Sequence, residues 1–255
     1  MEEKKWRSYP FVVNGLTTPI QYNEETVQGL FVPFLRRMTR LHESLGRRVI
    51  VFMAALPGVG KSTLATMFEL LSRDEEGIAP VQAIGLDGFH HHADYLQSHY
   101  FQREGERLPL AAIKGSPETF DLAHLRDKLA ALQKQDIKWP VYDRSIHDVI
   151  EEAEQVDKPL IIFEGNWLLL REQGWQDLRP FADYTLFITA SPADLRERLI
   201  ARKVLGGKTR AEAEAFYESS DKLNAERVLR ESAPADETWQ MLRDGDYRLQ
   251  EAGAD

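Results

Sequence analysis

The sequence predicts an α/β fold in which a central parallel sheet lies between layers of helices. Two observations point to this class. Short apolar runs rich in β-branched residues alternate with segments of helical apolar spacing; the runs cover residues 49–53, 81–86, 160–163 and 184–189. Such runs are typical of buried parallel strands, because crossover helices cover both faces of the sheet. In addition, the first run leads through a glycine-rich turn directly into a helical pattern.

Length, charge and composition narrow the class of protein. The chain has 255 residues, 43% of them hydrophobic, which is enough to bury the core of one large domain. A formal net charge of -9 argues against binding to nucleic acid or to an anionic membrane surface. The absence of cysteine excludes disulfides and thiolate metal sites. The chain shows neither a membrane-length apolar run nor the apolar core of a signal peptide, so we expect a cytoplasmic protein.

Residues 1–46 are predicted to form a hairpin and a helix that pack on the rest of the chain. Asn14-Gly15 lies between two extended stretches and favours a tight turn, because both central positions of that turn need positive φ. Asn23, followed by two glutamates, is a typical start of a helix. The helix would carry one apolar stripe: Val27, Leu30, Phe31, Phe34, Leu35, Met38 and Leu41.

Residues 47–255 are predicted to form one domain, because no long linker, repeat or low-complexity tract interrupts them. The long interval between the second and third predicted strands, residues 88–158, is expected to be a helical insertion. A last and weaker strand candidate spans residues 247–250.

A phosphate loop follows the first predicted strand. Residues 55–63 read Ala-Leu-Pro-Gly-Val-Gly-Lys-Ser-Thr, close to the motif G-x-x-x-x-G-K-[ST]. In that motif backbone N–H groups and a helix N-terminus surround the phosphates, the lysine reaches the β- and γ-phosphates, and the serine hydroxyl binds Mg²⁺. The predicted nucleotide site is Pro57, Gly58, Val59, Gly60, Lys61, Ser62 and Thr63.

Ala55 stands where the phosphate-loop motif has its first glycine. Alanine can follow a strand without positive φ, so we expect a loop that still binds nucleotide. The alternative is a glycine-rich turn without nucleotide. With its flanking strand and helix, the motif predicts the three-layer fold of the P-loop NTPases.

A carboxylate comes directly after each of two predicted strands: Asp87 after the second and Glu164 after the third. Ligands of such sheets bind beyond the carboxyl ends of the strands, so Lys61, Asp87 and Glu164 are expected to converge on one cleft. Glu164 lies where this architecture places the acid that holds Mg²⁺. Each acid alone is equally well explained as a helix cap or a solvated turn. The chain has neither the Asn-Lys-x-Asp guanine motif nor a Leu-Ser-Gly-Gly-Gln transporter signature.

Four segments then occur in a fixed order along the chain: Asp87-Gly-Phe-His90, Lys114-Gly-Ser-Pro-Glu-Thr-Phe-Asp121, Pro140-Val-Tyr-Asp143 and Phe163-Glu-Gly-Asn166. Together they resemble the corresponding segments of the pantothenate kinase, uridine kinase and phosphoribulokinase group of P-loop kinases. The resemblance covers roughly residues 48–230 and is nearest to a nucleoside/nucleotide kinase-like, fructose-transport-associated branch. Several ordered motifs are more specific than any one of them.

The resemblance implies roles for residues around the phosphoryl acceptor. Asp87 corresponds to the general base of the group, and a base within reach of the acceptor hydroxyl contributes about 10²- to 10⁴-fold. The insertion would carry the acceptor site, and the acceptor residues expected from the resemblance are His90, Lys114, Tyr142, Arg144 and His147. A sugar-like acceptor, a nucleoside and a pantothenate-like acceptor all remain open.

Residues 198–212 are predicted to form a lid. Ser191-Pro192 opens a helix on which Arg198 and Arg202 lie one turn apart. Gly206-Gly207 breaks this helix, and Thr209 begins a capping box that starts the next. Arginines on a closing lid can stabilise the transferring phosphoryl group. The alternative is a solvated helix face with internal ion pairs.

These observations predict an ATP- and Mg²⁺-dependent kinase of a small metabolite, with Asp87, Lys61, Arg198 and Arg202 as catalytic residues and Ser62 and Glu164 as metal ligands. The alternative is a nucleotide-binding regulatory ATPase without an acceptor. Kinases of the group often pair, so a homodimer is one expected state. The run His90-His-His92 is a weak metal candidate, because adjacent side chains on an extended segment point apart. Asp221 and Asn224 receive no role.

Overall fold

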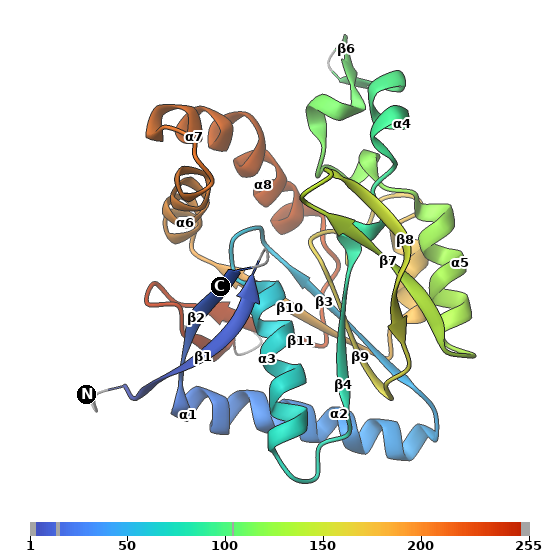
Figure 1. Ribbon diagram of the computed structural model, residues 1–255, viewed down its shortest axis with the longest axis vertical. Coiled ribbons are helices and arrows are strands. Elements are labelled where there is room, and N and C mark those ends of the chain that lie inside the picture. Colours follow the sequence, from blue (N-terminus) through green and yellow to red (C-terminus); the bar gives the residue numbers. More distant parts are fainter. Residues whose placement is uncertain (1–3, 14–15, 104, 251–255) are drawn as a thin grey trace.

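The computed structural model describes residues 4–13, 16–103 and 105–250. Within these ranges, six strands form the central sheet in the order β12-β11-β10-β3-β9-β4 (Figure 1). Their bounds are β3 (Val49–Ala55), β4 (Val81–Gly85), β9 (Leu160–Gly165), β10 (Tyr184–Ala190), β11 (Glu237–Met241) and β12 (Tyr247–Leu249). The four strands expected from apolar runs are all present, and they pair in parallel.

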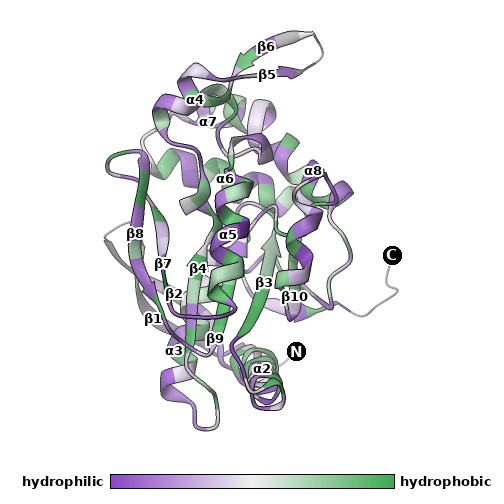
Figure 2. Ribbon diagram, turned by 90° about the vertical axis from the view of Figure 1, so that its right-hand side faces the viewer, coloured by the Kyte–Doolittle hydropathy of each residue, from purple (hydrophilic) through white to green (hydrophobic). Residues whose placement is uncertain are grey.

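The far edge of the sheet differs from the prediction. β11 pairs in parallel with β10, and β12 then pairs antiparallel with β11, so the sheet is not parallel throughout. β11 was not predicted, because its sequence Glu-Thr-Trp-Gln-Met alternates polar and apolar residues instead of forming an apolar run. By contrast, all seven residues of β3 are buried. Figure 2 shows the strongly hydrophobic strands β3, β9 and β10 at the centre of the molecule.

Helices cover both faces of the sheet, which confirms the three-layer α/β fold. The chain passes from β3 through α3 (Lys61–Asp74) to β4, and returns from β4 through α5 (Leu122–Leu132) to β9. The two crossovers run in opposite directions along the sheet, so their common right-handedness puts α3 and α5 on opposite faces. This arrangement brings the N-terminus of α3 and the ends of β4 and β9 to one edge.

The N-terminal hairpin and helix are present. β1 (Trp6–Val13) and β2 (Leu16–Asn23) pair antiparallel, while the predicted turn residues Asn14 and Gly15 lie outside the described residues. The helix consists of α1 (Glu24–Thr26), the π-helical turn η1 (Val27–Phe31) and α2 (Val32–Leu45). The predicted stripe packs on the core, where Phe31 stacks on Trp239 of β11 at 5.5 Å between ring centroids.

The segment 88–158 contains more than the helices expected of it. Besides α4 (Ala93–Ser98), α5 and the 3-10 turns η2 (Leu86–Phe89), η3 (Leu110–Ile113) and η4 (Pro117–Thr119), it holds the hairpins β5–β6 (Tyr100–Arg103, Glu106–Pro109) and β7–β8 (Ile137–Asp143, Asp148–Val156). The helices expected of the insertion are present, and two β-hairpins that were not expected accompany them. β8 is mostly exposed and charged, and is largely hydrophilic in Figure 2, so it lacks the alternation that identifies a strand.

The remaining helices follow β10, apart from the 3-10 turn η5 (Gln176–Phe181) that precedes it. They are α6 (Pro192–Leu205), α7 (Arg210–Phe216), the π-helical turn η6 (Tyr217–Asp221) and α8 (Lys222–Glu231). Ser191 caps α6 and Thr209 forms the predicted capping box at the start of α7. In Figure 1 these helices lie at the same end of the molecule as the insertion, opposite α2. No helix in the described part of the chain has the length and apolarity needed to span a membrane.

Candidate active site

The loop between β3 and α3 adopts a backbone that only glycine fits at two positions. Gly58 and Gly60 have φ of 87° and 81°, in the left-handed region. A Cβ on Gly60 would lie 3.1 Å from the Tyr247 hydroxyl and 3.2 Å from Thr63 Oγ1. The loop therefore brings its backbone to the N-terminus of α3 without side chains in the way, as a phosphate-binding turn requires.

Two side chains from distant elements hold this loop. The buried Tyr247 hydroxyl, from β12, donates to the carbonyl of Val59 at 2.7 Å, and Arg198 Nε, from α6, donates to the carbonyl of Gly58 at 3.0 Å. Burial raises the pKa of Tyr247, so its hydroxyl keeps the proton that it donates. Tyr247 was not among the predicted site residues, because a tyrosine in a short strand carries no signal that it contacts a loop 188 residues away.

The other loop residues fall where the motif predicts. Pro57 and Val59 are buried, and Thr63 Oγ1 donates to the carbonyl of Gly60 at 2.7 Å. Ala55 is the last residue of β3 and pairs with Ile188 of β10. The missing first glycine therefore falls inside a regular strand, where alanine introduces no strain.

Lys61, Ser62 and Glu164 lie together at the N-terminus of α3. The Ser62 hydroxyl donates to Glu164 Oε1 at 2.7 Å, and Lys61 Nζ lies 3.6 Å from Glu164 Oε2. Glu164 takes this place because it pairs with Met53 of β3 and Gly85 of β4 at the ends of the three strands. Mg²⁺ prefers oxygen ligands such as hydroxyl and carboxylate groups. The contacting side chains of Ser62 and Glu164, which were predicted to bind the metal, therefore have the right chemistry for Mg²⁺.

Asp87 follows β4 in the 3-10 turn η2. Its side chain is 57% exposed and lies 3.9 Å from the guanidinium of Arg144, measured to Oδ2. Asp87 is two residues beyond Gly85, the strand partner of Glu164. Two adjacent strand ends thus direct Glu164 and Asp87 toward the same edge of the sheet, where an exposed carboxyl remains accessible.

The glycine after Asp87 has a structural reason. A Cβ on Gly88 would lie 2.0 Å from the carbonyl oxygen of Pro140 in β7, which no side chain can tolerate. Trp139 Nε1 also donates to the carbonyl of Gly85 at 3.1 Å. Close packing of the turn against the β7–β8 hairpin therefore fixes the position of Asp87.

His90 is buried behind this turn. It is 8% exposed, its ring stacks on Phe120 at 3.9 Å between centroids, and its Nδ1 lies 3.1 Å from Thr119 Oγ1. Burial lowers the pKa of His90 to about 4, although the nearby Asp87 acts in the opposite direction. At neutral pH the imidazole is therefore uncharged.

Four of the expected acceptor residues form a chain of contacts that runs from His90 through Tyr142 and Lys114 to His147. Lys114 Nζ donates to the Tyr142 hydroxyl at 2.9 Å and to the carbonyl of His147 at 3.4 Å. The His90 ring meets Tyr142 edge-on at 6.0 Å. His147 has φ of 55° in the exposed turn of the β7–β8 hairpin, so its backbone, not its imidazole, makes the contact with Lys114.

The two arginines of the predicted lid differ. Arg198 contacts the phosphate loop, whereas Arg202 makes no side-chain hydrogen bond or ion pair within the described residues. Arg202 lies one turn further along α6. Burial raises the pKa of the nearby Asp221, and the charges of Lys203 and Arg202 oppose this shift. The structure therefore joins Arg198, but not Arg202, to the loop.

The other two histidines of the run lie near acidic side chains. His92 Nδ1 is 3.1 Å from Asp148 Oδ1, and its Nε2 is 3.7 Å from Glu151 Oε1. His91 stacks on Tyr95. Across the described ranges, no group of three or more histidine, aspartate or glutamate residues has an arrangement that could hold a metal ion.

Two curated relatives match most of the chain. The chain is 42% identical over 238 residues, 93% of its length and 97% of the relative, to "Uncharacterized protein YggC" of Escherichia coli K12. It is 29% identical over 205 residues, 77% of its length and 85% of the relative, to "Putative uridine kinase C227.14" of Schizosaccharomyces pombe. No protein-family profile matches the chain.

A solved structure agrees with the sequence relatives. The crystal structure of a "putative fructose transport system kinase" from Silicibacter sp. TM1040 matches with a TM-score of 0.68 and 29% identity, and covers 79% of this chain and 98% of that one. The fold, the loop and these relatives define a P-loop kinase. The chain belongs to the family that includes the YggC protein, in the group of pantothenate kinase, uridine kinase and phosphoribulokinase that its motifs resemble.

Proposed function

We propose that this kinase uses ATP and Mg²⁺ to phosphorylate a hydroxyl group of a small metabolite. The main support is the contact of Ser62 with Glu164 at the end of β9, together with the position of Asp87 just beyond the end of the neighbouring strand β4. Ser62 contacts Glu164 directly, and Asp87 follows the strand partner of Glu164 by two residues. Lys61 and the loop N–H groups would hold the phosphates, and Mg²⁺, when bound, would neutralise charge that develops on them.

Asp87 acts as the general base in this proposal. The acceptor oxygen forms a bond to the γ-phosphorus, the bond from that phosphorus to the bridging oxygen of ADP breaks, and ADP leaves with the electron pair. The hydroxyl proton passes to the Asp87 carboxylate. Arg144, 3.9 Å from Asp87, orients this carboxylate at the mouth of the acceptor site.

Residues 198–212 form the lid in this proposal. Arg198 already contacts the loop, and Arg202 lies one turn further along the same helix. Gly206 and Gly207 separate α6 from α7, and Gly207 has φ of 95°. A hinge of this kind permits closure that excludes water from the transfer step.

A sugar-like polyol is the first acceptor class in this proposal, ahead of a nucleoside and of a pantothenate-like molecule. The polar residues Lys114, Tyr142 and Arg144 offer hydrogen bonds to hydroxyl groups. A regulatory ATPase without acceptor is the second candidate, but it would leave no role for the Asp87 carboxyl, which is 57% exposed beside Arg144.

The proposed function is tested by measuring ATP consumption and phosphorylated product with and without a metabolite library. We expect turnover that depends on an acceptor, and a loss of about 10²- to 10⁴-fold in kcat for Asp87→Asn with nucleotide affinity unchanged. An exposed aspartate far from the site, Asp127→Asn, serves as the matched control. ATP turnover that is independent of every acceptor would support the regulatory ATPase instead.

A further inference from the structure

A cavity of about 480 Å³ lies between the insertion and the helix α8. One wall comes from β5 and the stretch 112–118, and the other from residues 219–231. Its volume falls in the range of small-molecule sites. Several lining side chains are polar, so the cavity is not simply a packing defect of the core.

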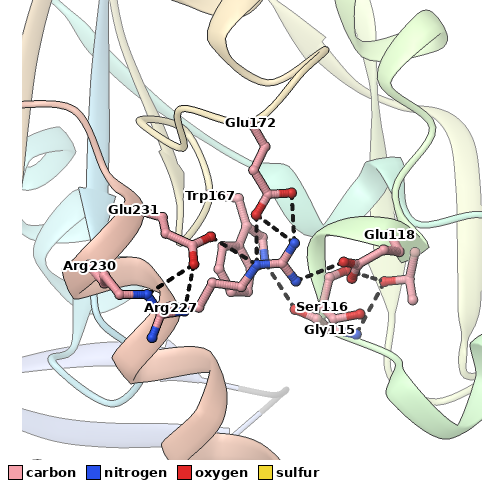
Figure 3. A network of polar contacts seen from close by, with 9 residues as sticks. Gly115, Ser116, Glu118, Trp167, Glu172, Arg227, Arg230 and Glu231 are labelled. Atoms are coloured by element: carbon pink, nitrogen blue, oxygen red, sulfur yellow. Dashed lines mark hydrogen bonds and ion pairs between the residues drawn. The ribbon is translucent and has the colours of Figure 1, made fainter. Parts of the chain in front are cut away.

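The only two cations among the described lining residues are held by carboxylates of the protein. Arg227 donates to Glu118 at 2.7 Å and, through Nε and Nη2, to both oxygens of Glu172 at 2.8 and 2.7 Å (Figure 3). Arg230 is paired with Glu231 at 2.5 Å. Arg227 also lies over the Trp167 ring, 5.8 Å from its centroid. These contacts fix the guanidinium of Arg227 in place.

Carboxylates outnumber cations around the cavity. Glu118, Glu226 and Glu231 line it together with Arg227 and Arg230, and Glu172 adds a further negative charge behind Arg227. Glu226 is exposed and forms no ion pair within the described residues. An incoming carboxylate or phosphate would have to displace Glu118 or Glu172 from Arg227 and would face the charge of Glu226. The cavity therefore disfavours anions.

The rest of the lining suits an uncharged molecule with many hydroxyl groups. Hydroxyl and amide groups alternate with apolar side chains that could pack against the C–H face of a ring. The Ser116 side chain is 8% exposed, and its hydroxyl has no hydrogen-bond partner in the described part of the structure. The polar lining residues include Gln102, Ser219 and Asn224, and the apolar ones include Phe101, Ile113 and Leu223.

The wall of the cavity is continuous with the candidate acceptor site. Thr119 Oγ1 donates to the carbonyl of Ser116 at 2.7 Å and lies 3.1 Å from Nδ1 of His90. Lys114, two residues before Ser116, donates to Tyr142. Trp167, which supports Arg227, donates to the carbonyl of Gly115 at 2.9 Å and follows Glu164 by three residues.

We propose that this cavity holds the body of the phosphoryl acceptor, and that it admits uncharged or cationic polyhydroxylated molecules such as sugars and amino sugars while it rejects carboxylates and phosphates. This inference rests on the proposed kinase function, because it assigns a binding site to the acceptor of that reaction and specifies which charge the acceptor carries. It separates a sugar-like acceptor from a pantothenate-like one, which carries a carboxylate.

Calorimetric binding with a non-hydrolysable ATP analogue and Mg²⁺ present tests the proposal without requiring turnover. The probes are glucose, galactose and mannose, each compared with its aldonate and its 2-amino sugar, together with pantothenate. We expect neutral or amino sugars to bind at least about tenfold more tightly than the matched aldonates and than pantothenate.

Two alanines of η3 give a matched pair of variants for the same measurement. Ala112 lines the cavity, and the adjacent Ala111, equally exposed, does not. Ala112→Trp is expected to weaken sugar binding by at least about tenfold, and Ala111→Trp by less than about twofold. Glu226→Arg is expected to reduce the preference for neutral over anionic probes, and Glu43→Gln on α2 is its distant control.

Three results would overturn the assignment of the cavity. They are equal sugar binding by the Ala112→Trp and Ala111→Trp variants, tighter binding of aldonates or pantothenate than of sugars, and no binding of any neutral or amino sugar at millimolar concentration. Failure of the proposed function is distinguishable, because it would be seen as ATP hydrolysis without phosphorylated product while sugar binding in the cavity persists.

Discussion

His90 lies in the Asp-Gly-Phe-His segment after β4, but its imidazole is buried against Phe120 and Thr119. A buried imidazole is easier to keep neutral than charged, which is why its pKa falls to about 4. Its neighbour Asp87, three residues earlier, is 57% exposed. Within this short motif, His90 is therefore suited to packing in the core, and the exposed Asp87 is suited to contact a substrate.

The buried His90 makes stability depend on pH. The unfolded chain protonates this histidine as the pH falls through 6.5, whereas the folded chain resists protonation until about pH 4. His90 stabilises the fold fully above pH 6.5, and we expect this contribution, about 3 kcal/mol, to be lost progressively as the pH falls from 6.5 to 4.

Urea unfolding of the wild type and of His90→Gln at pH 7 and pH 4.5 isolates the His90 contribution. The variant is expected to lose less stability between the two pH values, because glutamine does not titrate. His124→Gln, which removes a histidine that is only half-buried, is the control. Equal losses in wild type and His90→Gln would contradict a buried neutral His90.

At the scale of elements, Arg227 of α8 bonds to both the insertion and the loop after β9, and Arg171 of that loop adds hydrogen bonds to the carbonyls of Arg230 and Glu231. Arg227 of α8 is 23% exposed and contacts Glu118 of η4 and Glu172 beyond β9. Neither partner was identified from the sequence, because the pairs are 109 and 55 residues apart. Arg230, one turn along, is 69% exposed and pairs with its neighbour Glu231.

Arg227→Ala is expected to lower the free energy of unfolding by about 3–5 kcal/mol, because it leaves two partly buried carboxylates facing each other without a cation. Arg230→Ala breaks an exposed pair and is expected to cost less than about 1 kcal/mol. Urea denaturation measures both. If the two variants were equally stable, Arg227 would not be the link between α8 and the insertion.

In the molecule as a whole, a bound nucleotide and metal would contact a loop that is itself bonded to elements far apart in the chain. The phosphate loop is bonded to α6 through Arg198 and to β12 through Tyr247, and Ser62 is bonded to the end of β9 through Glu164. A ligand that binds only the folded state stabilises all of these elements together.

We therefore expect a non-hydrolysable ATP analogue with Mg²⁺ to raise the melting temperature, by the equivalent of about 2.7 kcal/mol at 100 times its Kd. Removal of Mg²⁺ with EDTA should reverse part of the increase, and Glu164→Gln should reduce that metal-dependent part. Thermal unfolding monitored by fluorescence gives the measurement, with Glu43→Gln as the control. A Glu164→Gln variant with an unchanged metal-dependent increase would remove Glu164 from the proposed metal site.

The class of fold and the residue types of the site could be predicted from local sequence patterns. Apolar runs such as that of β3 identify buried parallel strands, because both faces of each strand must be covered. The glycines of the phosphate loop are recognisable because their positive φ excludes other residues. Both signals are local, so they can be read from neighbouring residues alone.

Which of these residues lie in contact became apparent from the folded chain. Three hydrogen bonds join positions more than 50 residues apart: Ser62 to Glu164, Tyr247 to Val59, and Arg227 to Glu172. The structure likewise distinguished Arg198, which contacts the loop, from Arg202. Such contacts depend on how strands pair and helices pack. That pairing is a property of the whole chain, so no local pattern encodes it.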